Sequence, residues 1–348
     1  MNGTLKPAKI LLLGEAPGEQ EERLGSVFVG AAGRELDSLL SDVGLRRSDL
    51  ALTNVFNQRP PGNSLLAWSV TKKEADAAVS PSLPYHAIQA ETGKWVHPSK
   101  VQPALARLRE EIALVQPNLI IAMGNTAMSA VCNVSGIGKI RGTLYQGKLL
   151  PVKTIGTYHP AAVLRQYELR STVEIDLMKA KREAEFPELR LRRRVLYLEP
   201  TVRDLRQWYH TLSGAPALTV DCETSRGQIT CVGFSPDAIS SYVVPFWDRR
   251  RSDWSYWPTL DEEFEAWLFC YLLLTSDSIK ILQNGLYDLQ YFLRYRWPMR
   301  RFIHDTMIKF HSLYPGLPKG LDFLGSIYAN ERAWKKFRPR GGEEKDDA

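Results

Sequence analysis

The sequence contains only four cysteines, and no two of them form a C-x-x-C pair. Cys222 and Cys270 lie within apolar runs, where a thiol behaves as a small buried side chain. We therefore expect buried free thiols, and the spacing indicates neither a disulfide framework nor a thiolate metal site. The other two cysteines are Cys132 and Cys231.

Long hydrophobic runs are also missing. No segment approaches about 18 uninterrupted apolar residues, the length needed to cross a bilayer. Residues 1–6 lead directly into a strand-like run and leave no room for a signal peptide. We therefore expect a cytoplasmic protein without membrane association.

The excess of positive charge is small, at +6 over 348 residues. It suits a polyanionic partner without identifying one. The densest clusters are the arginines at 192–194 and 249–251, and solvated loops explain them as well as phosphate contacts do. The length and the 44% hydrophobic content are sufficient for two globular domains.

In the first half of the chain, short apolar runs alternate with helical patterns. The helical patterns include residues 33–43 and 101–115. Such an alternation predicts a parallel sheet covered by helices on both faces. The apolar runs lie at 10–13, 50–53, 119–122 and 149–155.

The second half has a different pattern, in which a helix at 202–212 precedes three strand-like runs joined by short turns. Short turns favour an antiparallel meander. A long apolar helix at 262–274 and a strand at 279–282 follow. We predict a first domain at 1–187, a basic linker at 188–197, a second domain at 198–340 and a disordered tail at 341–348, with a long unassigned loop at 64–100.

Polar clusters follow the predicted strands of the first domain. They include Glu15, Asn54 and His159, each just after the end of an apolar run. Because the carboxyl ends of parallel strands meet at one edge of a sheet, these side chains are expected to converge. A carboxylate, an amide and an imidazole gathered there suit the recognition of a flipped base and the cleavage of its glycosidic bond.

Three segments carry a resemblance to a known family. Residues 14–33 (GEAPGEQEERLGSVFVGAAG), 53–63 (TNVFNQRPPGN) and 159–165 (HPAAVLR) resemble the family 4 uracil-DNA glycosylases. The resemblance covers roughly residues 8–185. It implies a three-layer α/β/α fold in which a four-stranded parallel sheet lies between helices, and it implies DNA as the partner.

The resemblance also implies roles for individual residues. Glu15 would position or activate the attacking water, and His159 would donate to O2 of the departing uracil. A carboxylate near the sugar cation and a donor at O2 would stabilise opposite ends of one transition state. The implied base-binding residues are Phe28, Asn54 and Glu21, the last excluding a C5 methyl, and the implied DNA contacts are Arg59 and the minor-groove wedge formed by Val163, Leu164 and Arg165.

Each of these residues also has a structural alternative. Asn54 could cap a turn, and Glu15 could pair with an arginine. Phe28 lies between two valines and could belong to a core strand.

Two departures from the family matter. The family holds an iron–sulfur cluster through four cysteines, but here Gln58 occupies one of these places and no cysteine precedes Cys132. We therefore predict that no iron–sulfur cluster is bound. Residues 136–142 also lack the histidine-bearing insertion of the covalently trapping branch, which favours hydrolysis or binding over permanent attachment to DNA.

The second domain contains its own acidic motif, in which Asp221 and Glu223 are separated by one residue. In a strand this spacing places both carboxylates on one face. Asn284 and Asp288 follow a later strand. Carboxylate oxygens are the ligands that hard divalent cations prefer.

Asp-x-Glu followed by Asn-x-x-x-Asp resembles the first two motifs of the 3′→5′ exonucleases of family-A DNA polymerases. The resemblance runs from about 217 to 334 and implies a ribonuclease-H-like mixed sheet. It implies that Asp221, Glu223 and Asp288 bind Mg²⁺ or Mn²⁺, which would activate a water. Asp305 matches a family position, but we expect it to be structural, as a helix N-cap.

The third exonuclease motif, Tyr-x-x-x-Asp, is missing. Neither Tyr314 nor Tyr328 has an aspartate four residues later. We therefore expect little exonuclease activity. Three hypotheses remain: an enzyme that excises uracil or a related base, a non-catalytic DNA-binding module that recruits a separately encoded DNA polymerase, and an exonuclease completed by such a partner.

Overall fold

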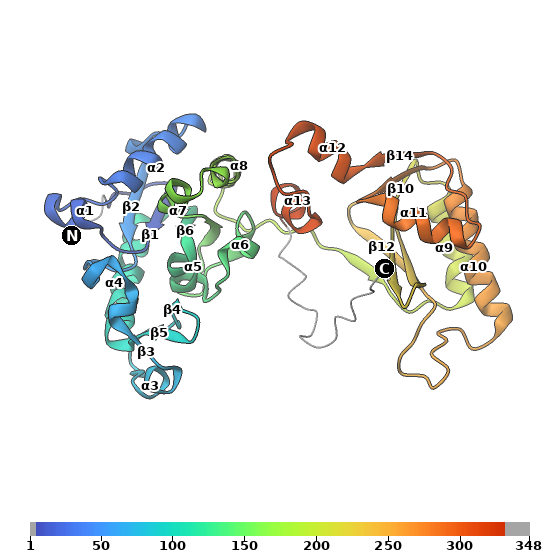
Figure 1. The fold of residues 1–348 in the computed structure, drawn as a ribbon, viewed down its shortest axis with the longest axis horizontal. Helices are drawn as coiled ribbons and strands as arrows, with labels where there is room; N and C mark the ends of the chain where they lie inside the picture. Colours follow the sequence, from blue (N-terminus) through green and yellow to red (C-terminus); the bar gives the residue numbers. More distant parts are fainter. Residues whose placement is uncertain (1–4, 331–348) are drawn as a thin grey trace. The chain divides into compact units, whose positions relative to one another are not determined.

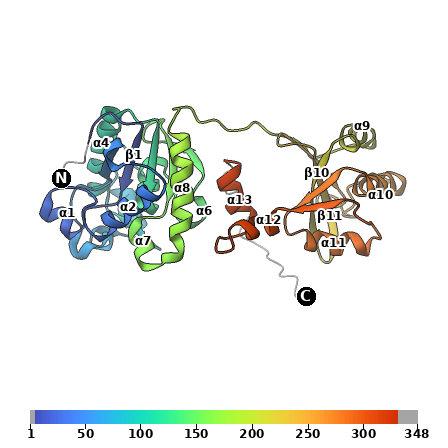
Figure 2. The same cartoon turned by 90° about the horizontal axis from the view of Figure 1, so that it is seen from above.

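The computed structural model describes residues 5–330 (Figures 1 and 2). Contacts within the chain divide it into two units. The first unit comprises Met1–Leu191 and the segment that begins at Asp322, and the second comprises Arg192–Leu321. Among the described residues, no helix is both long and apolar enough to span a membrane.

The sheet of the first unit contains five strands. β1 (Ile10–Gly14) lies between β2 (Leu50–Asn54) and β6 (Leu119–Met123), and β8 (Lys153–Thr157) pairs with β6. These four strands are parallel, which confirms the predicted sheet. A short strand that the sequence did not predict, β7 (Leu144–Gln146), is antiparallel to β8 at the edge.

Helices cover both faces of this sheet, because successive side chains of each strand point to opposite faces. Leu11 and Leu13 belong to the core on one face, and Ile10 and Leu12 belong to the core on the other. Figure 2 shows the helices around the sheet. The first core is covered by α4 (Pro98–Val115) and α5 (Gly124–Cys132), and the second by α2 (Ala31–Asp42), α7 (Pro160–Arg165) and α8 (Arg170–Glu183).

The unassigned loop at 64–100 contains a small sheet of its own. Its strand order is β3 (Ser69–Val70), β5 (Lys94–Val96) and β4 (Gln89–Glu91), and α3 (Lys72–Ala77) contacts β5. Strands of two or three residues carry too little alternation to be recognised in a sequence.

The second unit has a six-stranded mixed sheet. The predicted meander is formed by β10 (Ala217–Ser225), β11 (Gln228–Ser235) and β12 (Ser240–Pro245), and β13 (Ile279–Leu282) runs parallel to β10. The sequence did not predict the two edge strands, β9 (Val195–Tyr197) and β14 (Phe302–Asp305). One core joins the sheet to α9 (Val202–Ser213), α10 (Leu260–Thr275) and α11 (Gly285–Arg294), and α12 (Thr306–Leu313) follows β14.

The helix α13 (Leu321–Tyr328) differs from the predicted domain boundary. From Asp322 onward it belongs to the first unit, although we predicted a second domain extending to 340. Lys179 donates hydrogen bonds to the carbonyl oxygens of Gly142 and Ser326, and the Arg141 guanidinium lies 4.6 Å from the centre of the Phe323 ring. These contacts cover a buried ion pair between Arg141 and Asp176. The predicted tail at 341–348 lies outside the described residues.

Candidate active site

A cavity of about 300 Å³ opens at the carboxyl ends of the strands in the first unit. We call it the sheet-edge cavity. The position agrees with the rule that ligands bind beyond the carboxyl ends of parallel strands. Six of the residues singled out in the sequence line it: Glu15, Glu21, Phe28, Asn54, His159 and Arg165.

Glu15 follows β1 directly and is half-buried. The Thr126 hydroxyl, near the start of α5, donates a hydrogen bond of 2.5 Å to its Oε2. This contact fixes the orientation of the Glu15 carboxylate, whose position therefore depends on both β1 and α5. Thr126 was not identified from the sequence, because an isolated threonine in a helix carries no motif.

Glu21 is buried at the start of α1 (Glu19–Leu24) and accepts three backbone hydrogen bonds. Its Oε1 accepts from the amides of Val29 and Gly30 at 2.9 and 2.7 Å, and its Oε2 accepts from the amide of Gly18 at 3.1 Å. The carboxylate therefore holds together the two loops on either side of α1. These contacts support a positioning role, whereas direct exclusion of a C5 methyl remains a prediction.

Phe28 lies in the second of these loops, outside any strand, which removes the core-strand alternative. Its φ of +53° is unusual for a bulky residue. Arg47 holds this conformation, since its guanidinium donates to the carbonyl oxygens of Val27 and Phe28 at 2.6 and 2.8 Å. Arg47 is a further residue that the sequence patterns did not reveal.

The Phe28 ring stacks near the His159 ring, with 6.0 Å between their centres and 28° between their planes. Two glycines make this placement possible. A Cβ on Gly14 would lie 2.6 Å from the Phe28 ring and 2.3 Å from Asn54 Oδ1, and a Cβ on Gly33 would lie 2.0 Å from the Phe28 carbonyl oxygen. Any larger side chain at these positions would displace the aromatic ring.

Asn54 ends β2 and is buried. Its carbonyl oxygen accepts a hydrogen bond of 2.7 Å from Arg107, which also binds the carbonyl of Val55 and pairs with Glu111. The backbone is therefore fixed by α4, and the side chain lines the cavity.

His159 is the N-cap of α7, and its Nδ1 accepts a hydrogen bond of 3.2 Å from the amide of Ala161. A neutral imidazole that accepts at Nδ1 carries its proton on Nε2, where it can donate. Burial and, to a smaller extent, the positive charge of Arg165 lower the pKa of His159 to about 4, against an opposing contribution from Glu21. The ring is therefore neutral at pH 7.

The predicted minor-groove wedge is wrong in part. Val163 lies in α7 with only 1% of its surface exposed, because its side chain packs into the core beside the sheet. Leu164 is 53% exposed, and Arg165 is exposed and lines the cavity. The three residues form the end of a helix rather than a loop, so Val163 is not available to a ligand, and DNA contact by Leu164 and Arg165 stays a prediction.

Arg59, predicted to contact DNA, is held by acidic side chains of the same unit. Its guanidinium lies 3.7 Å from Glu19 and 3.5 Å from Glu22, and its Nε is buried without a hydrogen-bond partner. A phosphate contact by Arg59 would have to compete with these two carboxylates.

The residues of the first unit do not fit an iron–sulfur cluster. Such a cluster needs four ligands, usually thiolates, but Cys132 is the only cysteine in residues 1–191. Cys132 is buried in α5, and Gln58 is exposed. The absence of a cluster stays a prediction that an iron assay can test.

The acidic residues of the second unit are arranged differently. Asp221 and Glu223 face away from the core, while Asp288, on α11, is buried and accepts a hydrogen bond of 2.8 Å from the amide of Cys222. Desolvation and the negative charges of Asp288 and Glu223 raise the pKa of Asp221 to about 6. Within residues 5–330, no three His, Cys, Asp or Glu side chains are grouped as a metal site. Asp288 Oδ1 is engaged by the backbone of β10, and binding of Mg²⁺ or Mn²⁺ by Asp221, Glu223 and Asp288 stays a prediction.

Asp305 confirms its predicted structural role. It is the N-cap of α12 and accepts hydrogen bonds from the amides of Met307 and Ile308 at 2.9 and 3.2 Å. It also accepts from the amides of Asn284 and Gly285, at the start of α11. Cys222 and Cys270 are buried, as expected.

Comparisons with known proteins identify relatives of the first unit. The profile of the Uracil DNA glycosylase superfamily matches residues 2–186. The chain is 34% identical over 175 residues to the type-4 uracil-DNA glycosylase of Pyrobaculum aerophilum, covering 48% of this chain and 74% of that protein. For the type-4 enzyme of Archaeoglobus fulgidus the identity is 33%, and the match covers 49% and 75% of the two chains.

The other similarities are weaker. A DNA polymerase of Bacillus phage SP01 is 23% identical over 63% of this chain, but this chain spans only 21% of that polymerase. The structure of Escherichia coli RNase D matches 40% of this chain and 34% of its own, with 16% identity and a TM-score of 0.28. The profile match and the type-4 relatives together show that this chain belongs to the uracil-DNA glycosylase superfamily.

Proposed function

We propose that the first unit is a hydrolase that excises uracil from DNA. The observation that carries this proposal is the sheet-edge cavity, where Glu15, Asn54 and His159 converge beside the Phe28 ring. The type-4 uracil-DNA glycosylases among its relatives support the same substrate. The unit would act on a nucleotide extruded from the DNA stack, because the cavity lies beyond the sheet edge.

The roles of the cavity residues follow from their chemistry. Phe28 would stack on the base, and the Asn54 amide would bind its pyrimidine edge. The Nε2–H of neutral His159 would donate to O2, where negative charge develops as the base departs. Glu15 would orient the attacking water and stabilise the positive charge of the sugar.

Glu21 would act through the loop that carries Phe28. By fixing the amides of Val29 and Gly30, it would set how closely the ring approaches the C5 position of the base. Leu164 and Arg165, at the exposed end of α7, would contact the DNA next to the extruded nucleotide.

The direct test is the formation of abasic sites in single-stranded and double-stranded oligonucleotides that contain one uracil. The parent chain should release uracil, and Glu15→Gln should not. Glu110→Gln is a matched control, because Glu110 lies exposed on α4. Binding without release by the parent chain would favour the DNA-binding alternative.

A second candidate function concerns the second unit. Its Asp-x-Glu pair on one face of β10, and the match to a phage DNA polymerase, favour an exonuclease-like origin. We propose that this unit has little activity alone and would need a separately encoded polymerase or another partner to complete a metal site. Metal-dependent shortening of a 3′ end, measured with and without such a partner, tests this proposal.

A further inference from the structure

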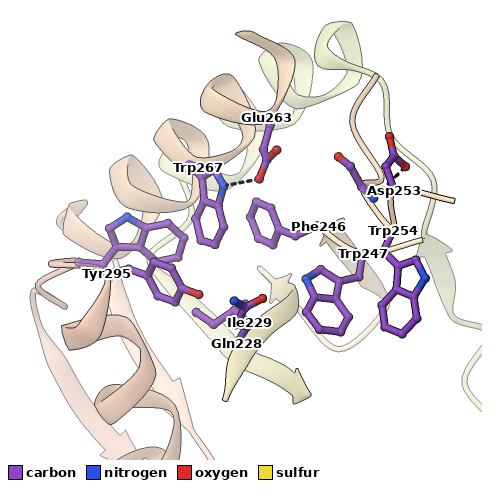
Figure 3. A pocket seen from close by; sticks show the side chains of 11 residues that line it. Gln228, Ile229, Phe246, Trp247, Asp253, Trp254, Glu263, Trp267 and Tyr295 are labelled. Atoms are coloured by element: carbon purple, nitrogen blue, oxygen red, sulfur yellow. Dashed lines mark hydrogen bonds between the residues drawn. The ribbon is translucent and has the colours of Figure 1, made fainter. Parts of the chain in front are cut away.

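The second unit contains a pocket of about 690 Å³ that the acidic motif does not use (Figure 3). We call it the aromatic pocket. It is bounded by the start of β11, the loop after β12, the first half of α10 and the segment after α11. Its lining includes Phe246, Trp247, Trp254, Glu263, Trp267 and Tyr295.

Rigid aromatic rings form one wall. Trp267 stacks on Phe246, with 3.8 Å between ring centres and 15° between planes, and its centre lies 4.9 Å from that of Tyr295. The indole Nε1 of Trp267 donates a hydrogen bond of 3.1 Å to Glu263. Tyr295 is 37% exposed, so a flat surface is open to solvent at this wall.

The loop after β12 forms the opposite wall, where Figure 3 shows Trp247 and Trp254 across from Trp267 and Tyr295. Trp247 forms a β-bridge with Ser255, and the amide of Asp248 donates to the Trp254 carbonyl at 2.9 Å. Trp254 is 37% exposed and has a φ of +60°. Residues held in this sparsely populated backbone region cluster at active sites and ligand clamps.

Charges of both signs lie around the pocket, because its charged lining residues, Asp253 and Glu263, are acidic and arginines lie beside it. Arg226 lies 5.0 Å from the centre of the Trp254 ring, and Arg249 is exposed on the same loop as Trp254. The lining carboxylates, Glu263 and Asp253, can accept hydrogen bonds from an amino group. Cationic rims with aromatic walls are the features by which proteins bind single-stranded nucleic acids.

We propose that the aromatic pocket binds a base of single-stranded DNA. The base would stack against the exposed rings of Trp254 and Tyr295, and the flanking phosphates would lie near Arg226 and Arg249. The pocket is separate from the acidic motif. Asp221 and Glu223 point away from the core of this unit, whereas Trp267 and Phe246 pack against it.

Tryptophans beside carboxylates can also bind a cation, such as a methylated lysine of a peptide. The arginine rim disfavours such a ligand, because the positive charges of Arg226 and Arg249 repel a cation. A cationic ligand is therefore an outcome that the test must separate from DNA.

The test uses the full chain and a short single-stranded oligonucleotide without uracil that carries one 2-aminopurine, whose fluorescence falls on stacking. Measurements are made in a metal chelator to prevent nuclease action. The parent chain should quench the fluorescence. Trp254→Ala and Tyr295→Ala should each weaken binding about 10-fold, within the range for loss of one stacked base.

Two further variants separate stacking from folding. Trp254→Phe retains a ring and should bind nearly as well as the parent chain. Tyr314→Ala removes an aromatic ring of comparable exposure that does not line the pocket, and it should have no effect. Melting curves of all variants identify any that fail to fold.

Three results would overturn the proposal. The first is that the parent chain does not quench the fluorescence. The second is that a folded Trp254→Ala/Tyr295→Ala double variant quenches it as strongly as the parent chain does. The third is that the chain binds tetramethylammonium, in a way that depends on Trp254, and does not bind the oligonucleotide. Uracil release is measured in the same variants and should be unchanged, so the proposal stands or fails separately from the glycosylase function.

Discussion

The carboxylates around Glu15 in the first unit and those around Asp221 in the second are held in different ways. Glu15 and Glu21 accept hydrogen bonds from a hydroxyl and from backbone amides, which fix their positions. Asp221 instead lies near two other acids, and its pKa is raised to about 6. A carboxylate that accepts hydrogen bonds is stabilised in its charged form and can act in catalysis without a further ligand. A group of neighbouring carboxylates repel one another and need a bound cation before they can act as a catalytic site.

The largest effect is expected from substitutions in the sheet-edge cavity. Glu15→Gln and His159→Asn should each reduce uracil release by ~10²–10³-fold, the usual consequence of losing one transition-state contact. Asparagine can still accept the hydrogen bond from the Ala161 amide, so α7 keeps its N-cap. Release rates under single-turnover conditions give the comparison, with Glu110→Gln as the control. Parent-like release by both variants would place the chemistry elsewhere.

A smaller effect is expected when the loop that carries Phe28 is loosened. Glu21→Gln replaces one acceptor oxygen with an amino group that faces backbone N–H donors. Uracil release should fall about 10-fold, and unfolding should become easier by about 1–3 kcal/mol. The ratio of uracil to thymine release should also fall. An unchanged ratio with slower release would show that the loop does not control selectivity.

The buried imidazole should make stability depend on pH. The folded pKa of His159, about 4, lies below its ordinary value of 6.5, so the unfolded chain binds the proton more readily. Stability should therefore fall as the pH drops from 6.5 toward 4, by an amount on the order of 2–3 kcal/mol. Denaturant unfolding of the parent chain and His159→Asn at several pH values measures this difference. Equal pH dependence in both proteins would contradict the assignment.

For the group around Asp221, little effect is expected. Degradation of a single strand from its 3′ end in Mg²⁺ should be very slow, and Asp221→Ala should change it less than about twofold, because two ions must be held about 3.5–4 Å apart. A helix bearing Tyr-x-x-x-Asp appended after Arg340 should raise the activity. Rapid digestion that Asp221→Ala abolishes would show that another acid completes the site, with Glu331 and the acids at 343–347, outside the described residues, as the first to examine.

The smallest expected signal is the iron content of the purified protein. With one cysteine in residues 1–191, the purified protein should be colourless and free of iron. A brown protein that absorbs near ~400 nm and contains stoichiometric iron would refute this prediction.

Much of the candidate active site could be predicted, because its residues lie directly after the ends of strands. β1 and β2 begin as apolar runs, and the run predicted at 149–155 overlaps the start of β8 at Lys153–Thr157, so the strand ends determine which edge Glu15, Asn54 and His159 share. Contacts between distant segments could not be predicted from the sequence. Arg47 and Thr126 hold the site through hydrogen bonds that no local pattern encodes.

The errors have the same origin. Val163 was assigned to a surface wedge from a motif, but burial depends on which face of α7 meets the core. The edge strands β7, β9 and β14 have three or four residues each, too few to show a period. Asp288 has the expected spacing, yet its hydrogen bond to β10 could not be foreseen from spacing.

Since α13 follows the second unit in the sequence but packs on the first unit, the first unit cannot be completed until the second unit has been synthesised. The residues that cover Asp176 and Lys179 begin at Asp322, so about 130 residues of the second unit must be translated before they are available. Domains usually fold as the ribosome releases them, from the N-terminus onward. Here the nascent first unit carries an uncovered cluster of charges until the second unit and α13 have been made, and a chaperone or a protease would encounter that surface before α13 does.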